Sequence, residues 1–230
     1  MINYLKERIE VLQSLLFDKT SLGKALFFSC AFSAFLSIGR VVYTKELAYI
    51  FLNWNLFLAY LPFAITRYLS GNEHILKQKW RSLFFFLSWL LLIPNSFYII
   101  TDLVHLRERT GAPLWYDVAM IFSFAWNGLL LGILSLRRME TMFRKRFTAL
   151  PEPVFLMPVI FLNALGIYIG RYLRYNSWDV ITDPYDLATD MLYLLVHPLR
   201  SRFDWSMIIC FTVLLSLLYI TIKRTAKAFI

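Results

Sequence analysis

The sequence predicts an all-α integral membrane protein, a bundle of six transmembrane helices with both termini in the cytoplasm. Apolar runs of roughly 20 residues recur along the chain, and an α-helix of that length crosses the hydrocarbon core of a bilayer. These runs lack the polar face that a helix of a soluble protein presents to water. Lys and Arg residues gather at alternate connections between the runs. Together the three observations favour a membrane bundle over a soluble fold.

The predicted spans follow one another without a long linker. They cover residues 22–38, 47–65, 82–100, 118–136, 154–172 and 206–222. No internal repeat or low-complexity tract divides residues 22–230, so we expect a single domain there. In residues 1–21, Leu5, Ile9 and Leu12 recur at helical spacing among charged residues. This pattern is typical of an amphipathic helix on the cytoplasmic surface of a membrane.

The basic residues predict the orientation. With the N-terminus in the cytoplasm, sixteen of the 24 Lys and Arg residues lie on the cytoplasmic side, whereas nine of the 15 acidic residues lie outside. The positive-inside rule favours this arrangement. The net charge of +9 is spread over four separate margins, which does not indicate nucleic-acid binding. It indicates contact with anionic head groups, so membrane lipids are the expected partners.

The longest connection, residues 174–205, is predicted to contain a short helix from about Pro184 to Val196. Asp186 and Asp190 fall on a different face of this helix from Leu187 and Leu194. We expect the helix to lie in the outer interface of the membrane, across the mouth of the bundle.

The third predicted span carries the sharpest local signal. Asn95, Tyr98, Asp102 and His105 are spaced three, four and three residues apart, which places them in one stripe on a continuous α-helix. Pro94 is expected to kink the helix and open room on that face. A helix that becomes polar as it leaves the membrane would explain Asp102 and His105 as well. It explains the deeper Asn95 and Tyr98 less readily.

Other spans bring polar side chains to the same depth. Asn55 lies in the outer half of the second span, and Asp117 opens the fourth. The end of the fifth span carries Arg171, Arg174, Asn176, Trp178 and Asp179. A charge near hydrocarbon is costly unless it is paired or hydrated. We therefore expect the two arginines to meet Asp102 and His105 in one site in the outer leaflet.

The two arginines stand one helical turn apart, so both guanidinium groups can contact one anion. Pairing with Asp102, Asp117 or Asp179 is the alternative. The anion expected at the level of the outer head groups is the phosphate of a lipid or lipid-linked molecule. Further contacts to the bound molecule are expected from Asn55, Asn95, Tyr98, Asn176 and Trp178.

Four residues are candidate catalytic groups: Asp102, His105, Asp117 and Asp179. Carboxylates and an imidazole transfer protons. Four such groups could also surround a divalent cation that activates water. No HExxH motif or paired-His helix supports a metal, and the sequence leaves open whether the chain holds a metal or another cofactor. The residues leave open both the reaction and whether the chain is an enzyme.

Several strings carry these residues in a specific combination. They are Trp54-Asn55-Leu56-Phe57-Leu58-Ala59, Pro94-Asn95 with Tyr98, Thr101-Asp102-Leu103 before His105-Leu106, Trp115-Tyr116-Asp117, and Gly170-Arg171 with Arg174 and Asn176-Ser177-Trp178-Asp179. The combination resembles a bacterial family of multi-pass membrane proteins, domain of unknown function 1361. The resemblance covers about residues 51–179 and implies a location in the bacterial cytoplasmic membrane. It implies no activity.

Two other classes of function fit the sequence. A non-catalytic subunit of an envelope membrane complex would dock another membrane protein on its outer face. A transporter of a small polar solute would use Asn127 and Asn163, which lie near the middle of their spans. A single interhelical hydrogen bond is the other interpretation of these two residues. Handling of a lipid or lipid-linked phosphate is the function we favour.

Overall fold

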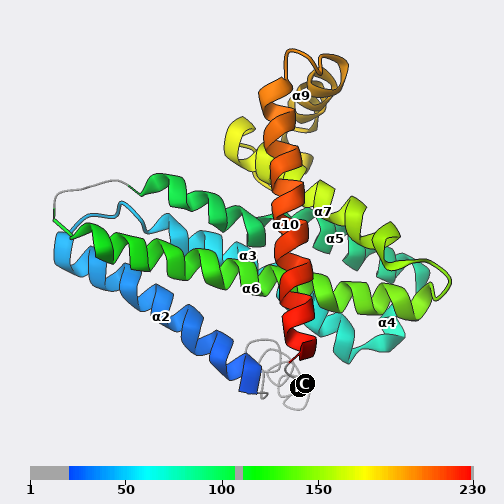
Figure 1. Ribbon diagram of the computed structural model, residues 1–230, viewed down its shortest axis with the longest axis horizontal. Coiled ribbons are helices and arrows are strands. Elements are labelled where there is room, and N and C mark those ends of the chain that lie inside the picture. The colour runs from blue at the N-terminus through cyan, green and yellow to red at the C-terminus, as the bar shows by residue number, and fades with distance from the viewer. Residues whose placement is uncertain (1–20, 107–110, 229–230) are drawn as a thin grey trace, which may run out of the picture. The chain divides into compact units, whose positions relative to one another are not determined.

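Most of the chain is helical in the part that the structure describes. A computed structural model gives residues 21–106 and 111–228, and no strand occurs within these ranges. Figure 1 shows the helices in chain order by colour. The all-α prediction is confirmed. The amphipathic helix predicted for residues 1–21 falls outside the described residues except for Ser21, which begins the first described helix.

Contacts define two compact units, Met1–Met139 and Glu140–Ile230. Unit 1 contains α2 (Ser21–Thr44), α3 (Phe51–Gly71), α4 (Glu73–Lys77), α5 (Lys79–Tyr98), the 3₁₀ helix η1 (Ile99–His105) and most of α6 (Leu114–Arg146). Unit 2 contains the end of α6, α7 (Glu152–Tyr168), the π-helical turn η2 (Ile169–Leu173), α8 (Asp179–Thr182), α9 (Pro184–Val196) and α10 (Arg202–Ala228). The boundary lies inside α6, and the single domain predicted over residues 22–230 stays a prediction.

Five helical stretches of the described residues are long and apolar enough to cross a membrane. They are Ser21–Thr44, Lys79–His105, Leu114–Arg146, Glu152–Leu173 and Arg202–Ala226. The second predicted span, residues 47–65, corresponds to α3, which has the length but carries Asn53, Asn55 and Arg67 among its apolar residues. The chain is thus a multi-pass membrane protein. The sixth span and the orientation stay predictions.

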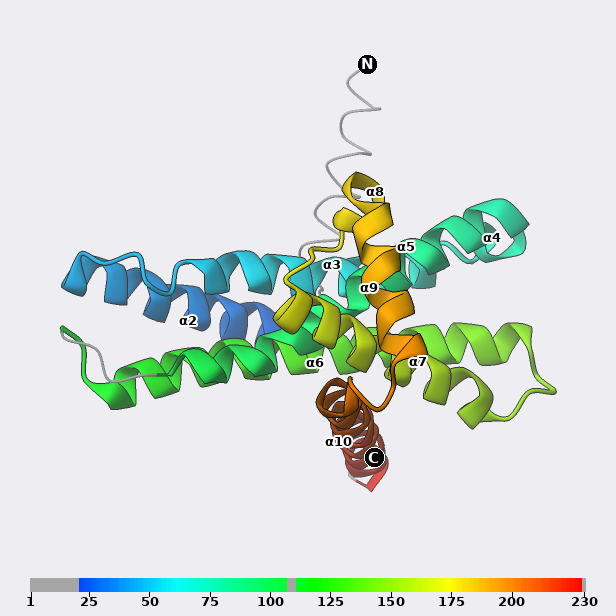
Figure 2. The ribbon, with the colours of Figure 1, turned by 90° about the horizontal axis from the view of Figure 1, so that it is seen from above.

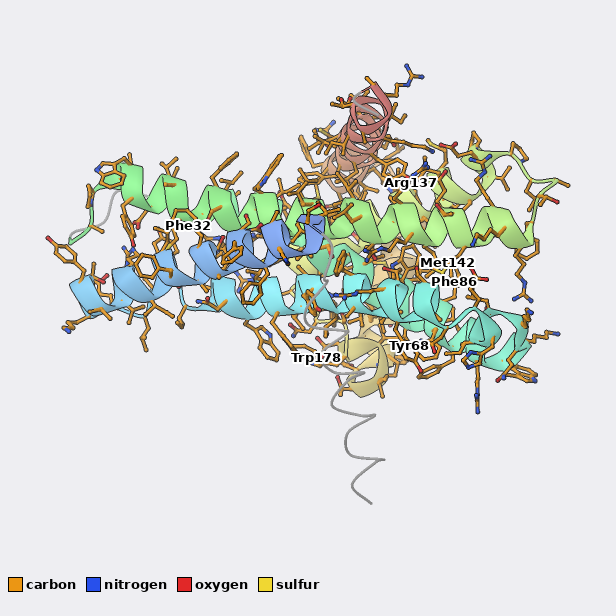
Figure 3. The ribbon with its side chains drawn as sticks, turned by 90° about the horizontal axis from the view of Figure 1, so that it is seen from below. Phe32, Tyr68, Phe86, Arg137, Met142 and Trp178 are labelled. Carbon is orange, nitrogen blue, oxygen red and sulfur yellow. The ribbon has the colours of Figure 1, made fainter. Side chains whose placement is uncertain are left out.

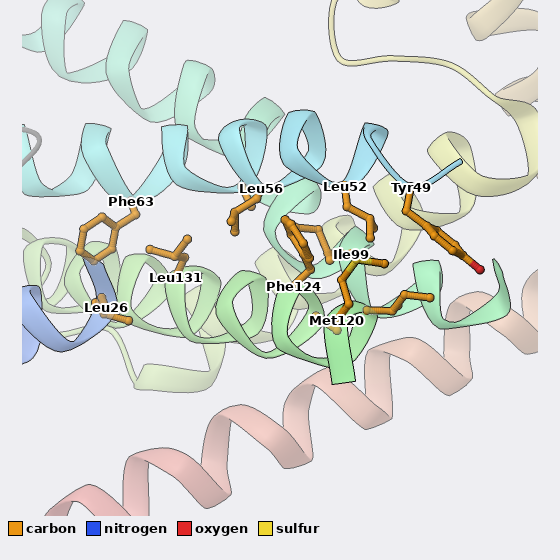
Figure 4. Close-up of a cluster of buried hydrophobic side chains, with 12 residues drawn as sticks. Leu26, Tyr49, Leu52, Leu56, Phe63, Ile99, Met120, Phe124 and Leu131 are labelled. Atoms are coloured by element: carbon orange, nitrogen blue, oxygen red, sulfur yellow. The ribbon is translucent and has the colours of Figure 1, made fainter. Parts of the chain in front are cut away.

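In unit 1, helices α2, α3 and α6 lie side by side, as the two perpendicular views of Figures 1 and 2 show. Between them lies a cluster of buried apolar side chains (Figure 4). Helix α3 contributes Leu52, Leu56, Ala59 and Phe63, which recur at the spacing of one helix face. Lipid tails are as apolar as these side chains, so close packing holds the helices together more than removal from water does.

Two glycines let α6 approach α5 closely. A Cβ atom added at Gly128 would lie 2.7 Å from the carbonyl oxygen of Ser96. One added at Gly132 would lie 2.9 Å from the ring of Phe97. The hydroxyl of Ser96 donates to the carbonyl of Ala59 on α3 at 2.8 Å. Gly128 and Gly132 are four residues apart, which is the spacing of a small-residue packing motif.

Polar contacts bind helix α2 to the rest of unit 1. Its exposed face is rich in phenylalanine, including Phe32, which is labelled in Figure 3. Its buried face carries Ser33 and Ser37. Asn127 of α6 donates to the hydroxyl of Ser33 at 2.8 Å, and Asn53 of α3 donates to that of Ser37 at 2.8 Å. The interhelical hydrogen bond predicted as one interpretation of Asn127 is therefore present.

In unit 2, α7 packs against α10. Ala164, Tyr168, Leu194 and Ile208 form its buried apolar cluster. Leu194 belongs to α9, whose bounds are those predicted from the sequence. The position of α9 in the outer interface stays a prediction.

The other end of unit 2 holds a buried charged network. Glu140 at the end of α6 accepts hydrogen bonds from the hydroxyl of Tyr219 and, at 2.8 Å, from the ammonium of Lys223. The same ammonium also donates to Glu152 at the start of α7. The side chain of Lys223 is 11% exposed and that of Glu140 is 1% exposed. One cation thus joins three helices, and we name Glu140, Glu152, Tyr219 and Lys223 the unit 2 network.

Candidate functional site

Polar side chains gather in unit 1 where the connection between α2 and α3, residues 45–50, meets the end of η1. The hydroxyl of Tyr49 in this connection donates to the backbone carbonyl of His105 at the end of η1, at 3.1 Å. We name the polar residues around this contact the unit 1 cluster: Arg40, Tyr49, Asn55, Asp102, His105 and Asp117.

Asp102 and His105 lie at the centre of this cluster. The Asp102 side chain is 1% exposed and that of His105 is 40% exposed, with 4.0 Å between Oδ1 of the aspartate and Nδ1 of the histidine. The side chain of Asn55 donates to the other carboxylate oxygen, Oδ2, at 2.8 Å. A buried, fixed carboxylate beside an accessible imidazole is an arrangement suited to acid–base catalysis, because the carboxylate orients the ring.

The local helix type places these two side chains together. From Ile99 onward the chain forms a 3₁₀ helix, in which residues three apart align because a turn contains 3.0 residues. The hydroxyl of Thr101 donates to the carbonyl of Tyr98 at 2.6 Å, three residues back, and this bond supports the tighter turn. Asp102 and His105 therefore share one side of η1.

The prediction of a continuous α-helix through His105 is wrong. The α-helix ends at Tyr98, and the helical stretch continues from Ile99 to His105 as the 3₁₀ helix η1. The side chain of Asn95 donates to the carbonyl of Leu92 at 3.0 Å. The roles of Asn95 and Tyr98 in binding stay predictions.

Asp117 is held by Arg40, a residue of α2 that was not predicted for the site. Nε of Arg40 donates to Oδ1 of Asp117 at 2.6 Å, and Nη2 donates to Oδ2 at 3.2 Å. Both side chains are buried. The guanidinium also lies 4.6 Å from the centre of the Tyr49 ring. Among the described residues, Nη1 of Arg40 has no hydrogen-bond partner.

A signal for Arg40 was present in the sequence. It closes a stripe that begins with Ser33 and Ser37, all three at the spacing of one helix face. An ionisable residue at the end of such a stripe faces the bundle interior rather than lipid. The two hydrogen bonds from Arg40 give Asp117 a structural task, which is to hold the guanidinium in place. The catalytic role of Asp117 stays a prediction.

The described residues contain no group of three His, Cys, Asp or Glu side chains that could hold a metal ion. Asp117 is engaged by Arg40. Asp179, in unit 2, accepts hydrogen bonds from the backbone N–H of Asn176 at 2.6 Å and from the hydroxyl of Thr182 at 3.0 Å. These donors hold the pKa of Asp179 below its ordinary value. They engage Asp179 within its own turn, at the start of the short helix α8.

Arg171 and Arg174 do not lie on one α-helix. Helix α7 ends at Tyr168, Arg171 belongs to the π-helical turn η2, and Arg174 follows with a left-handed backbone, φ 63°. The backbone N–H of Tyr175 reaches back to the carbonyl of Ile169 at 3.3 Å and closes the turn. The predicted spacing of one α-helical turn between the arginines is wrong, because Arg171 lies in a π-helical turn and Arg174 ends that turn in a left-handed conformation.

Around this turn the side chains differ in exposure. Arg171 is half-buried and Arg174 is exposed. Trp178 (Figure 3) and Asn176 are also exposed. The hydroxyl of Tyr175 donates to Asp190 at 3.0 Å, and desolvation together with this bond raises the pKa of Tyr175 to about 12. The convergence of the arginines with Asp102 and His105 stays a prediction, since these residues belong to different units.

Comparison with known proteins identifies the family. The family described as "Protein of unknown function (DUF1361)" matches residues 54–218, a range that includes all eleven residues predicted for the site. No curated protein and no solved structure matches the chain. The chain belongs to the DUF1361 family, and its apolar helices make it a multi-pass membrane protein of that family.

Proposed function

We propose that this protein binds a lipid or lipid-linked phosphate at the outer face of the bacterial cytoplasmic membrane and processes its head group. His105 and Asp102 transfer the proton, and Arg171 and Arg174 contact the phosphate. The observation that carries the proposal is the accessible His105 imidazole beside the buried Asp102 carboxylate, which Asn55 holds by a 2.8 Å hydrogen bond.

The burial of Asp102 supports an acid–base role for His105. A carboxylate that is taken out of water needs donors, and Asn55 supplies one of them without adding charge. The second carboxylate oxygen, Oδ1, is the one that lies 4.0 Å from Nδ1 of His105. A small movement closes this gap to a hydrogen bond, which would leave Nε2 as the proton-transferring atom.

The surroundings of Arg174 support a phosphate ligand. The guanidinium is exposed at the end of a membrane-spanning stretch, and the nearby carboxylates Asp179 and Asp190 have donors of their own. Exposed Tyr172 and Trp178 flank it in the sequence, and such rings prefer the level of the head groups. A planar guanidinium binds phosphate oxygens in pairs, which an ammonium cannot do.

Native mass spectrometry on the full chain tests the binding. The chain is incubated with phosphatidylglycerol or with a polyprenyl phosphate, and retained lipid is counted for Arg174→Lys and for the control Arg200→Lys, an exposed arginine of the same connection. We expect Arg174→Lys to lose lipid at unchanged thermal stability and Arg200→Lys to retain it. Equal retention in both variants would contradict the phosphate contact.

Sidedness has its own test. In a background of Cys30→Ala and Cys210→Ala, single cysteines at Glu46 and Asp186 are exposed to an impermeant maleimide in whole cells, as are cysteines at Gly71 and Thr148. Labelling of the first two alone is expected if both termini are cytoplasmic. The reverse pattern would move the proposed site to the cytoplasmic face.

A non-catalytic subunit of an envelope complex is the second candidate. The closed Arg40–Asp117 pair favours it, because a buried pair can fix the register of helices without any ligand. In that case a membrane-protein partner would co-purify in a fixed ratio, and His105→Gln would leave lipid retention and turnover unchanged.

A further inference from the structure

We propose that Tyr49 is a positioning residue for His105 and that the Arg40–Asp117 pair holds Tyr49 in place. This inference rests on the proposed acid–base role of His105. It assigns a task to three buried side chains that the proposed reaction itself does not use.

The contact between Tyr49 and His105 is made through the backbone. Tyr49 is buried and its hydroxyl donates to the carbonyl of His105 at 3.1 Å. His105 is the last residue of η1, and the final carbonyls of a helix have no partner within that helix. Tyr49 supplies the missing donor. A fixed peptide group at position 105 restricts where the imidazole can lie.

The Tyr49 ring is in turn held by a charged group that packs on its face. The Arg40 guanidinium lies 4.6 Å from the ring centre, and Asp117 holds that guanidinium by two hydrogen bonds of 2.6 and 3.2 Å. The chain of contacts runs from α6 through α2 and the 45–50 connection to η1. Because Arg40 and Asp117 carry opposite charges, they anchor Tyr49 with no net charge placed near His105.

Two further neighbours define where the imidazole is held. The ring of Phe51 lies 5.3 Å from that of His105, centre to centre. Asp102 belongs to η1, as His105 does, and its Oδ1 atom lies 4.0 Å from Nδ1 of His105. The distance to Asp102 is the quantity that matters, since a displacement of about 1 Å in a catalytic group can lower a rate by roughly two orders of magnitude. Loss of the Tyr49 hydroxyl is therefore expected to act on this distance.

The chain offers a direct way to measure it. It contains three histidines, so His74→Gln with His197→Gln leaves His105 as the single histidine. With ¹⁵N-histidine and ¹³Cγ-aspartate in the full chain, solid-state dipolar recoupling in liposomes reports the separation of the His105 ring nitrogens from the nearest carboxylate. Asp102→Asn identifies that carboxylate by removing the signal.

Tyr49→Phe in this background is the decisive variant. It keeps the ring that stacks under Arg40 and removes only the hydroxyl. We expect the His105–Asp102 coupling to weaken to that of a separation longer by roughly 1 Å or more, while the melting temperature of the protein changes little. The matched control is Tyr116→Phe, which removes a hydroxyl that donates to the backbone carbonyl of Leu36 at 2.8 Å and is expected to leave the coupling unchanged.

An unchanged coupling in Tyr49→Phe would overturn the proposal, and so would an equal loss in Tyr116→Phe. If Tyr49→Phe does not fold, Arg40→Met with Asp117→Leu removes the anchor and keeps the hydroxyl, and the same loss of coupling is expected. The measurement uses no added ligand. It can therefore fail while the lipid retention of the Arg174 experiment succeeds, which separates this inference from the proposed function.

Discussion

The unit 1 cluster and the unit 2 network both bury charges, but they neutralise them differently. In the unit 2 network one ammonium donates to two carboxylates, and a tyrosine hydroxyl also donates to Glu140. In the unit 1 cluster Arg40 and Asp117 form a closed pair, and Asp102 faces the accessible side chain of His105 at 4.0 Å. The first arrangement joins helices, whereas the second leaves one group that can exchange a proton with a bound molecule.

The largest effect is expected when the closed pair is broken on one side. Asp117→Ala strands the buried Arg40 guanidinium and should lower the free energy of unfolding by about 3–5 kcal/mol, measured in mixed detergent micelles. Arg40→Met combined with Asp117→Leu should recover most of that loss, because no unpaired charge remains. A cost under about 1 kcal/mol for Asp117→Ala would mean that water reaches the pair.

The second largest loss of stability is expected from a substitution in the unit 2 network. Lys223→Met removes the cation that Glu140 and Glu152 share and should cost about 2 kcal/mol, the usual range for hydrogen bonds to charged groups. Arg224→Met, at the exposed neighbouring position, is the control and should change stability by no more than about 0.5 kcal/mol. Similar costs for both variants would show that the network contributes little.

His105→Gln should have a still smaller effect on stability, within about 0.5 kcal/mol, because the side chain is partly exposed and its Nδ1 atom has no hydrogen-bond partner among the described residues. Its effect on turnover of a lipid-linked phosphate should be large, since loss of a general acid or base lowers rates by roughly 10²–10⁴. Thermal scans and head-group release, followed by ³¹P NMR, measure the two properties. A destabilised His105→Gln would assign the histidine to architecture.

The smallest effect concerns Asp179, whose pKa lies below its ordinary value because Asn176 and Thr182 donate to it. The folded state favours the charged form. The contribution of Asp179 to the stability of the folded state is therefore fully present above the ordinary Asp pKa of about 4. It is lost as the pH falls through the lowered pKa. Hydrogen exchange at the Asn176 amide should accelerate in that acidic range, and Asp179→Asn should remove the pH dependence. An unaltered profile in Asp179→Asn would assign it to another group.

The sequence allowed the helices to be predicted where periodicity alone decides them. The bounds of α9 are as predicted, because its apolar and acidic residues alternate at the period of a helix. The prediction was wrong where the backbone conformation depends on a hydrogen bond from one side chain or on how a helix ends. Thr101 supports a 3₁₀ turn after Tyr98, and Arg174 adopts a left-handed conformation. Hydrophobic patterns report neither feature.

The candidate site was predictable only where its residues are close together in the sequence. The pairing of Asp102 with His105 follows from a spacing of three residues, which 3₁₀ geometry makes closer still. The contacts of Asp102 with Asn55 and of Arg40 with Asp117 join segments 47 and 77 residues apart. A single sequence identifies such residues as unusual polar groups but does not pair them. Arg40 was missed because it lies beyond the end of the first predicted span, residues 22–38.

The most direct test of the central claim asks whether a lipid phosphate lies beside His105. In the variant with His105 as the single histidine, ³¹P dephasing of the ¹⁵N-histidine signal is recorded in phosphatidylglycerol liposomes. A companion variant that retains only His74, on the exposed helix α4, measures the background from mobile lipid. We predict strong dephasing at His105 that Arg174→Lys reduces, and little at His74. Equal dephasing at the two histidines, unaffected by Arg174→Lys, would contradict the account.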